Sequence, residues 1–192
     1  MEIFTFQDSG KKQMKKLFLL LFSLAVLSGC ALFDDDDFVY PLSVSFLKPT
    51  EWNKKIIPAR QGCRSDGGKG YTPPLYISGI PSKVNVLIME INDLDNPALS
   101  ENGGLGSIGF YHNGESSATL LPVPGESNEL PEFAFKEKSS RVDPIKPYPY
   151  MPPCLEKEHR YAITIKAVTR TGSFDKQKTV LRGKGYINIG KY

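Results

Sequence analysis

The alternation of apolar and polar residues predicts β-strands in several short segments of the chain. Residues 42–46 and 161–168 alternate with a period of two, whereas residues 83–91 are apolar on both faces. Successive side chains of a strand point to opposite faces, so alternation predicts one buried face and a continuous apolar run predicts burial on both. We therefore expect residues 83–91 to form a central strand. Residues 107–112 and 186–190 are weaker strand candidates.

The rest of the chain gives no sign of long helices. No segment after residue 30 has a helical apolar repeat of useful length, and the chain is rich in glycine and proline, with 17 and 15 residues. This pattern predicts an all-β fold with long loops and little helix. Residues 122–153 are predicted to be a long loop within one domain, because the strands on either side need each other for burial.

The strongest apolar run lies near the start of the chain and has the plan of a secretory signal. A lysine pair precedes residues 17–27, and small residues lead to Cys30. A run of this length is too short for a comfortable membrane span. The sequence "LSGC" resembles the bacterial lipoprotein box, whose cysteine is lipidated; the alternative is an ordinary signal peptide with a chance cysteine. We expect residues 1–29 to be a lipoprotein signal peptide, with Met14 as a second candidate start.

Lipidation of Cys30 predicts a protein that is anchored to a membrane of the bacterial cell envelope. More than one acyl chain gives stable anchoring without a spanning helix. The residue after the lipidated cysteine is Ala31 and not aspartate. This favours the outer membrane as the location of the protein, if the cell sorts its lipoproteins as enteric bacteria do. Residues 30–40 contain the run "DDDD" and are predicted to be a lipidated, solvated acidic tether. Residues 41–192 are predicted to form the folded domain.

Composition narrows the class of protein. Removing residues 1–29 leaves 163 of the 192 residues, enough for one domain, and lowers the net charge from +3 to +1, because four lysines and two acidic residues are lost. A nearly neutral chain without a basic cluster argues against a nucleic-acid partner. The sequence contains no Gly-x-Ser-x-Gly elbow, phosphate loop or metal constellation. We therefore expect no enzymatic activity, catalytic residue, metal or cofactor.

Besides Cys30, the sequence contains two cysteines, Cys63 and Cys154. An even pair in an exported domain predicts a disulfide, and the alternative is two separate thiols. Closing a loop of about ninety residues would contribute on the order of 4–5 kcal/mol of stability in the chain-entropy model. A disulfide would make Cys154 a covalent cross-link rather than a nucleophile.

Several local patterns follow one another in order between residues 42 and 192. They are Ile57-Pro58-Ala59-Arg60, Cys63 with Gly67, Pro73-Pro74-Leu75, Gly79-Ile80-Pro81, Asp93-x-Asp95-x-Pro97, Pro153-Cys154, His159-Arg160-Tyr161 and the closing "INIGKY". In order and spacing they resemble the phosphatidylethanolamine-binding proteins, especially the bacterial Raf-kinase-inhibitor-like branch of that family. The resemblance also implies the family's cis peptide at Pro73 or Pro74, a geometry that only proline makes cheap.

This resemblance implies an antiparallel β-sandwich-like domain with a small anion pocket at one end, where members bind phosphate-like groups. Carried over residue by residue, the pocket would be lined by Asp93, His159 and Tyr161, with Asp95 beside them and Tyr150 as a further candidate. An imidazole and a phenol can donate to an anion's oxygens, while a carboxylate orients the imidazole. The alternatives are turn carboxylates at a strand end and a histidine that bonds a loop carbonyl.

The chain departs from the family at two places near this pocket. The family's second histidine should fall near Leu105 or Gly106, and neither offers a side-chain donor. His112 is a further candidate ligand if the loop is longer here; the alternative is a histidine at a strand end beside an Asn-Gly turn. If Pro152 replaces the glycine that the family carries before Cys154, a backbone N–H donor is lost.

Three hypotheses on function follow. A lipid-anchored envelope protein that binds a small anion or a phosphorylated headgroup requires His159 and Asp93 side by side. Alternatively, the protein is an interaction or inhibitor module that contacts an envelope protein through residues 97–153, which contain the proline-rich "DPIKPYPYMPP". Enzymatic turnover is the weakest alternative, because two histidines leave few general bases.

The lipid anchor can be tested by substituting its cysteine. A Cys30→Ala variant loses the thiol that carries the lipid, so we expect it to leave the membrane fraction for the soluble fraction of the envelope. Fractionation with immunoblotting measures the partition. Membrane association equal to that of the unsubstituted protein would contradict the anchor.

Overall fold

The structure is a computed structural model that describes residues 38–154, 158–173 and 176–192. The signal segment 1–29, the lipidation site Cys30 and the acidic run lie outside the described residues. Within these described ranges, no helix is both long enough and apolar enough to cross a membrane.

The larger of two β-sheets holds six strands in the order β1-β9-β8-β4-β5-β7. All neighbours pair antiparallel except β1 and β9, which run parallel. The bounds of these strands are β1 Tyr40–Pro41, β4 Val86–Asp93, β5 Ser107–Tyr111, β7 Ala134–Lys138, β8 Arg160–Thr171 and β9 Lys178–Lys191.

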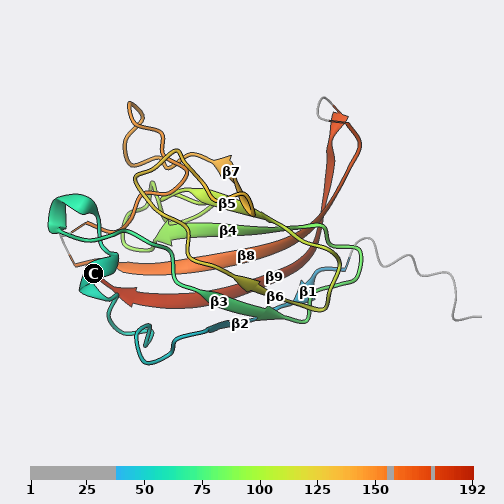
Figure 1. Ribbon diagram of the computed structural model, residues 1–192, viewed down its shortest axis with the longest axis horizontal. Helices are drawn as coiled ribbons and strands as arrows, with labels where there is room; N and C mark the ends of the chain where they lie inside the picture. The colour runs from blue at the N-terminus through green and yellow to red at the C-terminus, as the bar shows by residue number, and fades with distance from the viewer. Residues whose placement is uncertain (1–37, 155–157, 174–175) are drawn as a thin grey trace, which may run out of the picture. The chain divides into compact units, whose positions relative to one another are not determined.

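The smaller sheet holds three short antiparallel strands in the order β2-β3-β6. Its strands are β2 Ser43–Phe46, β3 Leu75–Ser78 and β6 Ser117–Leu120. Two short 3-10 helices, η2 Ala59–Gln61 and η3 Arg64–Asp66, lie between β2 and β3 in the sequence. In Figure 1 they gather at the end of the large sheet where the C-terminus lies.

The two sheets share one hydrophobic core. Alternate residues of β8, among them Ile163 and Ile165, are fully buried and belong to the same cluster as Leu75 and Ile77 of the small sheet. Burial of apolar side chains between two sheet faces is the driving force of a sandwich. The structure therefore confirms an all-β, largely antiparallel, sandwich-like fold with little helix.

Glycines in β9 let the two sheets come close together. A Cβ added to Gly183 would lie 2.8 Å from a methyl carbon of Leu42, and one added to Gly185 would lie 2.6 Å from Val44. The Leu42 N–H donates to the carbonyl of Lys184 at 2.9 Å, between the parallel pairing of β1 and the start of β2. A side chain at either glycine would push β2 away from β9. The close packing therefore explains why β9 contains these two glycines, although glycine has a low strand propensity.

The pattern of the sequence found β2, β4, β5 and β8 and only the second half of β9, and it missed β1, β3, β6 and β7. β4 is buried at every position and lies between β8 and β5, as predicted for a central strand. Residues 122–153 are not loop throughout, because β7 forms there at the edge of the large sheet. The short strands β3 and β6 also carried no convincing alternation.

The prediction of a cis peptide at Pro73 or Pro74 is wrong, since no cis peptide occurs among the described residues. The backbone N–H of Thr72 donates to Val123 at 3.0 Å, and the Val123 N–H returns a bond to the Thr72 hydroxyl at 2.9 Å. These bonds hold the chain in line with β3, which begins at Leu75, so no reversal is needed. The trans form of an X-Pro bond is then the favoured one.

Cys63 and Cys154 form a disulfide across 91 positions of sequence, as predicted. The Cys63 N–H also donates to the carbonyl of Pro153 at 2.9 Å, so the bridge continues a backbone contact between the two segments. It ties the segment around η3 to the chain that leads into β8. The cross-link therefore fastens two long loops at one end of the large sheet.

Removing the disulfide should destabilise the protein strongly. For the double variant Cys63→Ala/Cys154→Ala we expect the free energy of unfolding to fall by on the order of 4 kcal/mol, because a loop of this length restricts the unfolded chain. Urea denaturation followed by fluorescence of the single tryptophan measures the change. An unchanged midpoint, or two free thiols per unreduced chain, would contradict the cross-link.

Candidate functional site

Three strand ends meet at the candidate site. β4 ends at Asp93, which pairs with Tyr161 of β8, and Arg160 at the start of β8 pairs with Lys191 of β9. His159 and Tyr192 exchange two backbone hydrogen bonds of 3.1 Å just beyond this pairing. Antiparallel register thus brings residues 66 positions apart to one end of the sheet, near η2 and η3 in Figure 1.

Asp93 and His159 form a hydrogen-bonded pair. Nδ1 of His159 lies 2.7 Å from Oδ2 of Asp93, whose side chain is 7% exposed against 25% for the imidazole. The other oxygen of Asp93 accepts the backbone N–H of Asp95 at 3.1 Å. A carboxylate acceptor fixes Nδ1 as the protonated nitrogen and holds the ring in one orientation. Nε2 of His159 has no hydrogen-bond partner among the described residues.

Two buried tyrosines lie beside this pair. The rings of His159 and Tyr161 are 6.4 Å apart, and Tyr161 and Tyr150 are 3% and 2% exposed. Burial raises the pKa of both phenols well above the usual value; the Asp93 carboxylate adds to this for Tyr161, and Tyr161 adds to it for Tyr150. Both hydroxyls therefore stay protonated at neutral pH and remain hydrogen-bond donors. Neither has a hydrogen-bond partner in the described part of the chain.

Glu126 is a neighbour of the site that the sequence did not indicate. Its backbone has a positive φ of 49°, and its N–H donates to the carbonyl of Tyr150 at 3.0 Å. Its carboxylate accepts the backbone N–H of Arg64 at 2.7 Å. The one available signal was the Pro-Gly turn before it, in a segment without strand pattern.

Asp95 clamps the start of β8. Both of its oxygens accept hydrogen bonds from the guanidinium of Arg160, and one accepts the Arg160 backbone N–H at 2.8 Å. The side-chain bond to Arg160, followed by the backbone bond, lowers the pKa of Asp95 from 3.8 to about 2. Arg160 thus occupies the oxygens of Asp95, and this contact helps to position His159, the residue before Arg160. That Asp95 also lines the site stays a prediction.

His112 lies at the far end of the sheet from His159. Its N–H donates to Asn85, the residue before β4, whereas Asp93 ends β4, and an eight-residue strand spans roughly 25 Å. Its Nε2 lies 2.8 Å from the carbonyl of Glu115 in the following turn. The alternative of a histidine at a strand end is therefore the correct one, and His112 takes no part in the candidate site.

The positions expected for the family's second histidine do lie near the site. Ile91, two residues before Asp93, exchanges backbone bonds with Leu105 at 3.0 Å and Gly106 at 3.1 Å. Gly106 also packs against Pro149, where an added Cβ would lie 2.0 Å from the carbonyl oxygen. Neither position offers a side chain that could donate to a ligand.

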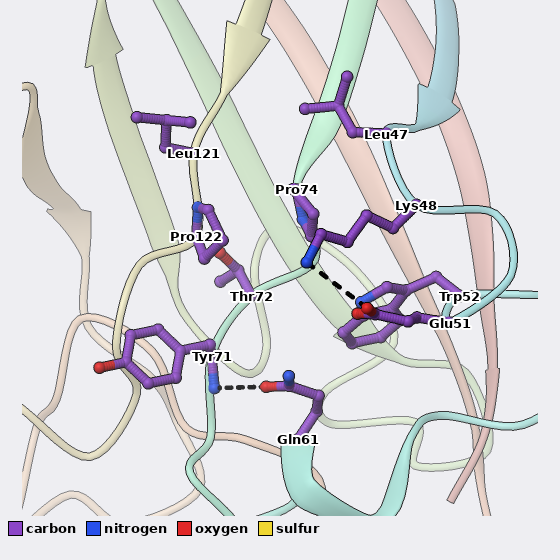
Figure 2. Close-up of a pocket in the computed structure, with 10 residues that line it drawn as sticks. All are labelled: Leu47, Lys48, Glu51, Trp52, Gln61, Tyr71, Thr72, Pro74, Leu121 and Pro122. Carbon is purple, nitrogen blue, oxygen red and sulfur yellow. Dashed lines mark hydrogen bonds and ion pairs between the residues drawn. The ribbon is translucent and has the colours of Figure 1, made fainter.

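A separate hollow lies beyond the ends of the small sheet (Figure 2). It has a volume of about 460 Å³ and is largely apolar, with a weak Lys48–Glu51 ion pair of 3.5 Å and a bond of 3.1 Å from the Tyr71 N–H to Gln61. Trp52 is buried there and stacks on Phe46. The lining residues are Leu47, Lys48, Glu51, Trp52, Gln61, Tyr71, Thr72, Pro74, Leu121 and Pro122. None of them is a ligand candidate from the sequence.

One cluster of the described residues has the composition of a metal-ligand set. Ligand atoms of Cys63, Asp66 and Cys154 lie within 4.8 Å of one another. The disulfide occupies both sulfurs, and a metal ligand must be a free thiolate. While the bridge is formed, the cluster therefore offers a single carboxylate and does not make a metal site.

Comparison with known proteins identifies the N-terminal segment. Residues 14–31 match the prokaryotic membrane lipoprotein lipid attachment site. The chain is a lipid-anchored protein of the cell envelope.

No curated protein matches the chain. A solved structure that is similar is a putative phosphatidylethanolamine-binding protein homologue from Chlamydia trachomatis, with a TM-score of 0.44, 19% identity and coverage of 79% of this chain and 97% of that chain. The sequence motifs resemble this same family.

The Asp95–Arg160 clamp predicts a pH-dependent effect on stability. The folded-state pKa of Asp95, about 2, lies below the ordinary 3.8, so its contribution is complete above about pH 4 and is lost as the pH falls towards 2. We expect Asp95→Asn to lower stability at pH 7, and the difference from the unsubstituted protein to shrink between pH 4 and pH 2. Urea denaturation at several pH values measures it. A difference that persists unchanged to pH 2 would rule out the clamp as its cause.

Proposed function

We propose that this protein is a binding protein, held by its lipid on the outer membrane, whose His159 site takes a small anionic group such as a phosphate ester. The observation that carries the proposal is Nε2 of His159, which no described residue hydrogen-bonds, on a ring that Asp93 orients through a contact of 2.7 Å to Nδ1. Protonated phenols at Tyr161 and Tyr150 lie beside it. Because Nδ1 carries the proton, Nε2 of the neutral ring is an acceptor, while the two phenols are donors without a partner among the described residues. A phosphate ester that still carries one proton would complete this set, since its oxygens accept from the phenols and its O–H donates to Nε2.

Neighbouring carboxylates set the kind of anion that fits. Asp93 and Glu126 place negative charge beside the donors, and this charge also contributes to the raised pKa values of Tyr161 and Tyr150. Like charges repel, so a dianion that carries no positive charge is expected to bind weakly. A ligand that carries an ammonium group next to its phosphate would offset this repulsion. Phosphoethanolamine is therefore expected to bind more tightly than inorganic phosphate.

Binding rather than turnover is the activity we propose. An Asp-oriented histidine can act as a general base, but covalent catalysis also needs a nucleophile within hydrogen-bond reach of the imidazole. Among the described residues no hydroxyl or thiol hydrogen-bonds Nε2 of His159, and the sulfurs of Cys63 and Cys154 are joined to each other. The site thus has the donors of a binding site without the partner of a hydrolase.

Exposed apolar side chains support a second candidate function, contact with an envelope protein. Ile145 is 89% exposed and Val142 is 42% exposed, both in the proline-rich stretch after β7. Apolar side chains on a proline-rich loop are a common feature of protein-binding surfaces. This function would use residues 97–153 and would not need His159.

A ligand titration with matched histidine variants tests the first proposal. We expect phosphoethanolamine to bind the lipidated protein in detergent micelles, and His159→Gln to weaken the affinity about tenfold or more, because a hydrogen bond to a charged group contributes roughly 1.5–3 kcal/mol. His112→Gln is the control, since this histidine lies at the other end of the sheet, and it should bind like the unsubstituted protein. Isothermal titration calorimetry gives the affinities. Equal affinity in both variants would contradict a binding site at His159 and would favour the second candidate function, which uses residues 97–153.

A further inference from the structure

The described chain enters the large sheet at the end away from the candidate site. β1 runs parallel to β9, with Tyr40 paired to Gly183, and β9 then continues to Lys191 beside the site. The described chain therefore enters the sheet at the end opposite to His159, as Figure 1 shows for the blue strand β1 and the C-terminus. Gly183 and Lys191 are eight residues apart along β9, and at about 3.3 Å per residue this is a distance of about 26 Å.

The tether is barely long enough to reverse this arrangement. Cys30 precedes Phe38, the first described residue, by eight positions. A fully extended chain covers at most about 3.6 Å per residue, which gives a reach of about 29 Å. For His159 to contact the membrane that holds the lipid, the tether would have to extend along the sheet from the anchor end to the site end. That distance is almost the full length of the extended tether.

The anchor end carries side chains that suit a membrane surface. At the anchor end Lys178 and Lys184 are exposed, and Phe38 is 54% exposed. Lysines near a membrane surface are attracted to anionic headgroups, and an aromatic ring suits the interface.

We infer that the anchor end, around Phe38 and Lys178, rests against the headgroups of the membrane that holds the lipid, and that the His159 site opens away from it. This inference rests on the proposed function for the identity of the ligand. The anionic group that fills the site then comes from the aqueous side, either dissolved or displayed on a facing surface. A headgroup of the protein's own bilayer does not reach the site.

Energy transfer to the membrane surface tests the orientation. Trp52 is the single tryptophan, and it lies at the site end, four residues before Ile56, which bridges to Lys191. The lipidated protein is placed on vesicles that contain a dansyl-labelled headgroup lipid. A Phe38→Trp variant adds a donor at the anchor end, and its exposed position tolerates the larger ring. We expect the added tryptophan to transfer energy several-fold more efficiently than Trp52, and equal or more efficient transfer from Trp52 would overturn the inference.

A second measurement distinguishes the two sources of ligand. Soluble phosphoethanolamine is titrated into the lipidated protein on vesicles of phosphatidylcholine alone, and on vesicles in which half of the lipid is phosphatidylethanolamine. Because the site faces away, we expect the same apparent affinity on both. Weaker binding on the phosphatidylethanolamine vesicles would mean that local headgroups compete, which overturns the inference. Absence of binding on both would refute the proposed function, while the energy-transfer result would still decide the orientation.

Discussion

The pairing of β8 with β4 on one side and with β9 on the other is the constraint on which the rest of the structure depends. β8 spans Arg160–Thr171 and is hydrogen-bonded along both edges, so it fixes the register of its two neighbours. One end of this three-strand unit carries the Asp93–His159 pair, and the opposite end receives β1. A shift of one residue would turn the buried face of β8 outward and separate Asp93 from His159. The hydrophobic core and the site are thus held by the same set of backbone bonds.

The site itself illustrates how burial and charge act together. Asp93 is buried but satisfied, since one oxygen contacts His159 and the other accepts a backbone N–H. Tyr161 is buried next to that carboxylate, and both effects keep its proton in place. Unpaired donors in a partly closed site favour an acceptor ligand, whereas the surrounding carboxylates weaken binding of simple anions. This opposition is the basis of the proposed preference for a ligand of mixed charge.

Much of the sandwich could be predicted because its central strands are apolar enough to reveal their period. β4 and β8 were visible in the sequence, and the motif at residues 159–161 pointed to the correct end of β8. The first half of β9 was hidden, because Gly183 and Gly185 are placed there for close packing against β2 rather than for strand propensity. The edge strand β7 depends on its partner β5 and has little pattern of its own. Local periodicity does not record such tertiary requirements.

The candidate site was predictable to a similar degree, and the reasons differ by residue. The Asp93–His159 contact follows from strand ends and a known motif order, whereas Glu126 sits in a loop whose path only the folded chain reveals. His112 had the right chemistry at the wrong end of a strand. Asp95 had the right place but is fully engaged by Arg160, a pairing that depends on side-chain direction. Residue type and spacing therefore located the site but did not assign every role within it.

The disulfide has a consequence for the survival of the protein in a compartment that contains proteases. The proline-rich stretch around Ile145 is the most exposed apolar part of the described chain and lies between Cys63 and Cys154 in sequence. A protease that cut this stretch would leave two fragments joined by the bridge and by the pairing of β4 with β8. The nicked molecule would keep its lipid and its site in one particle, and the cut would become visible only on a reducing gel.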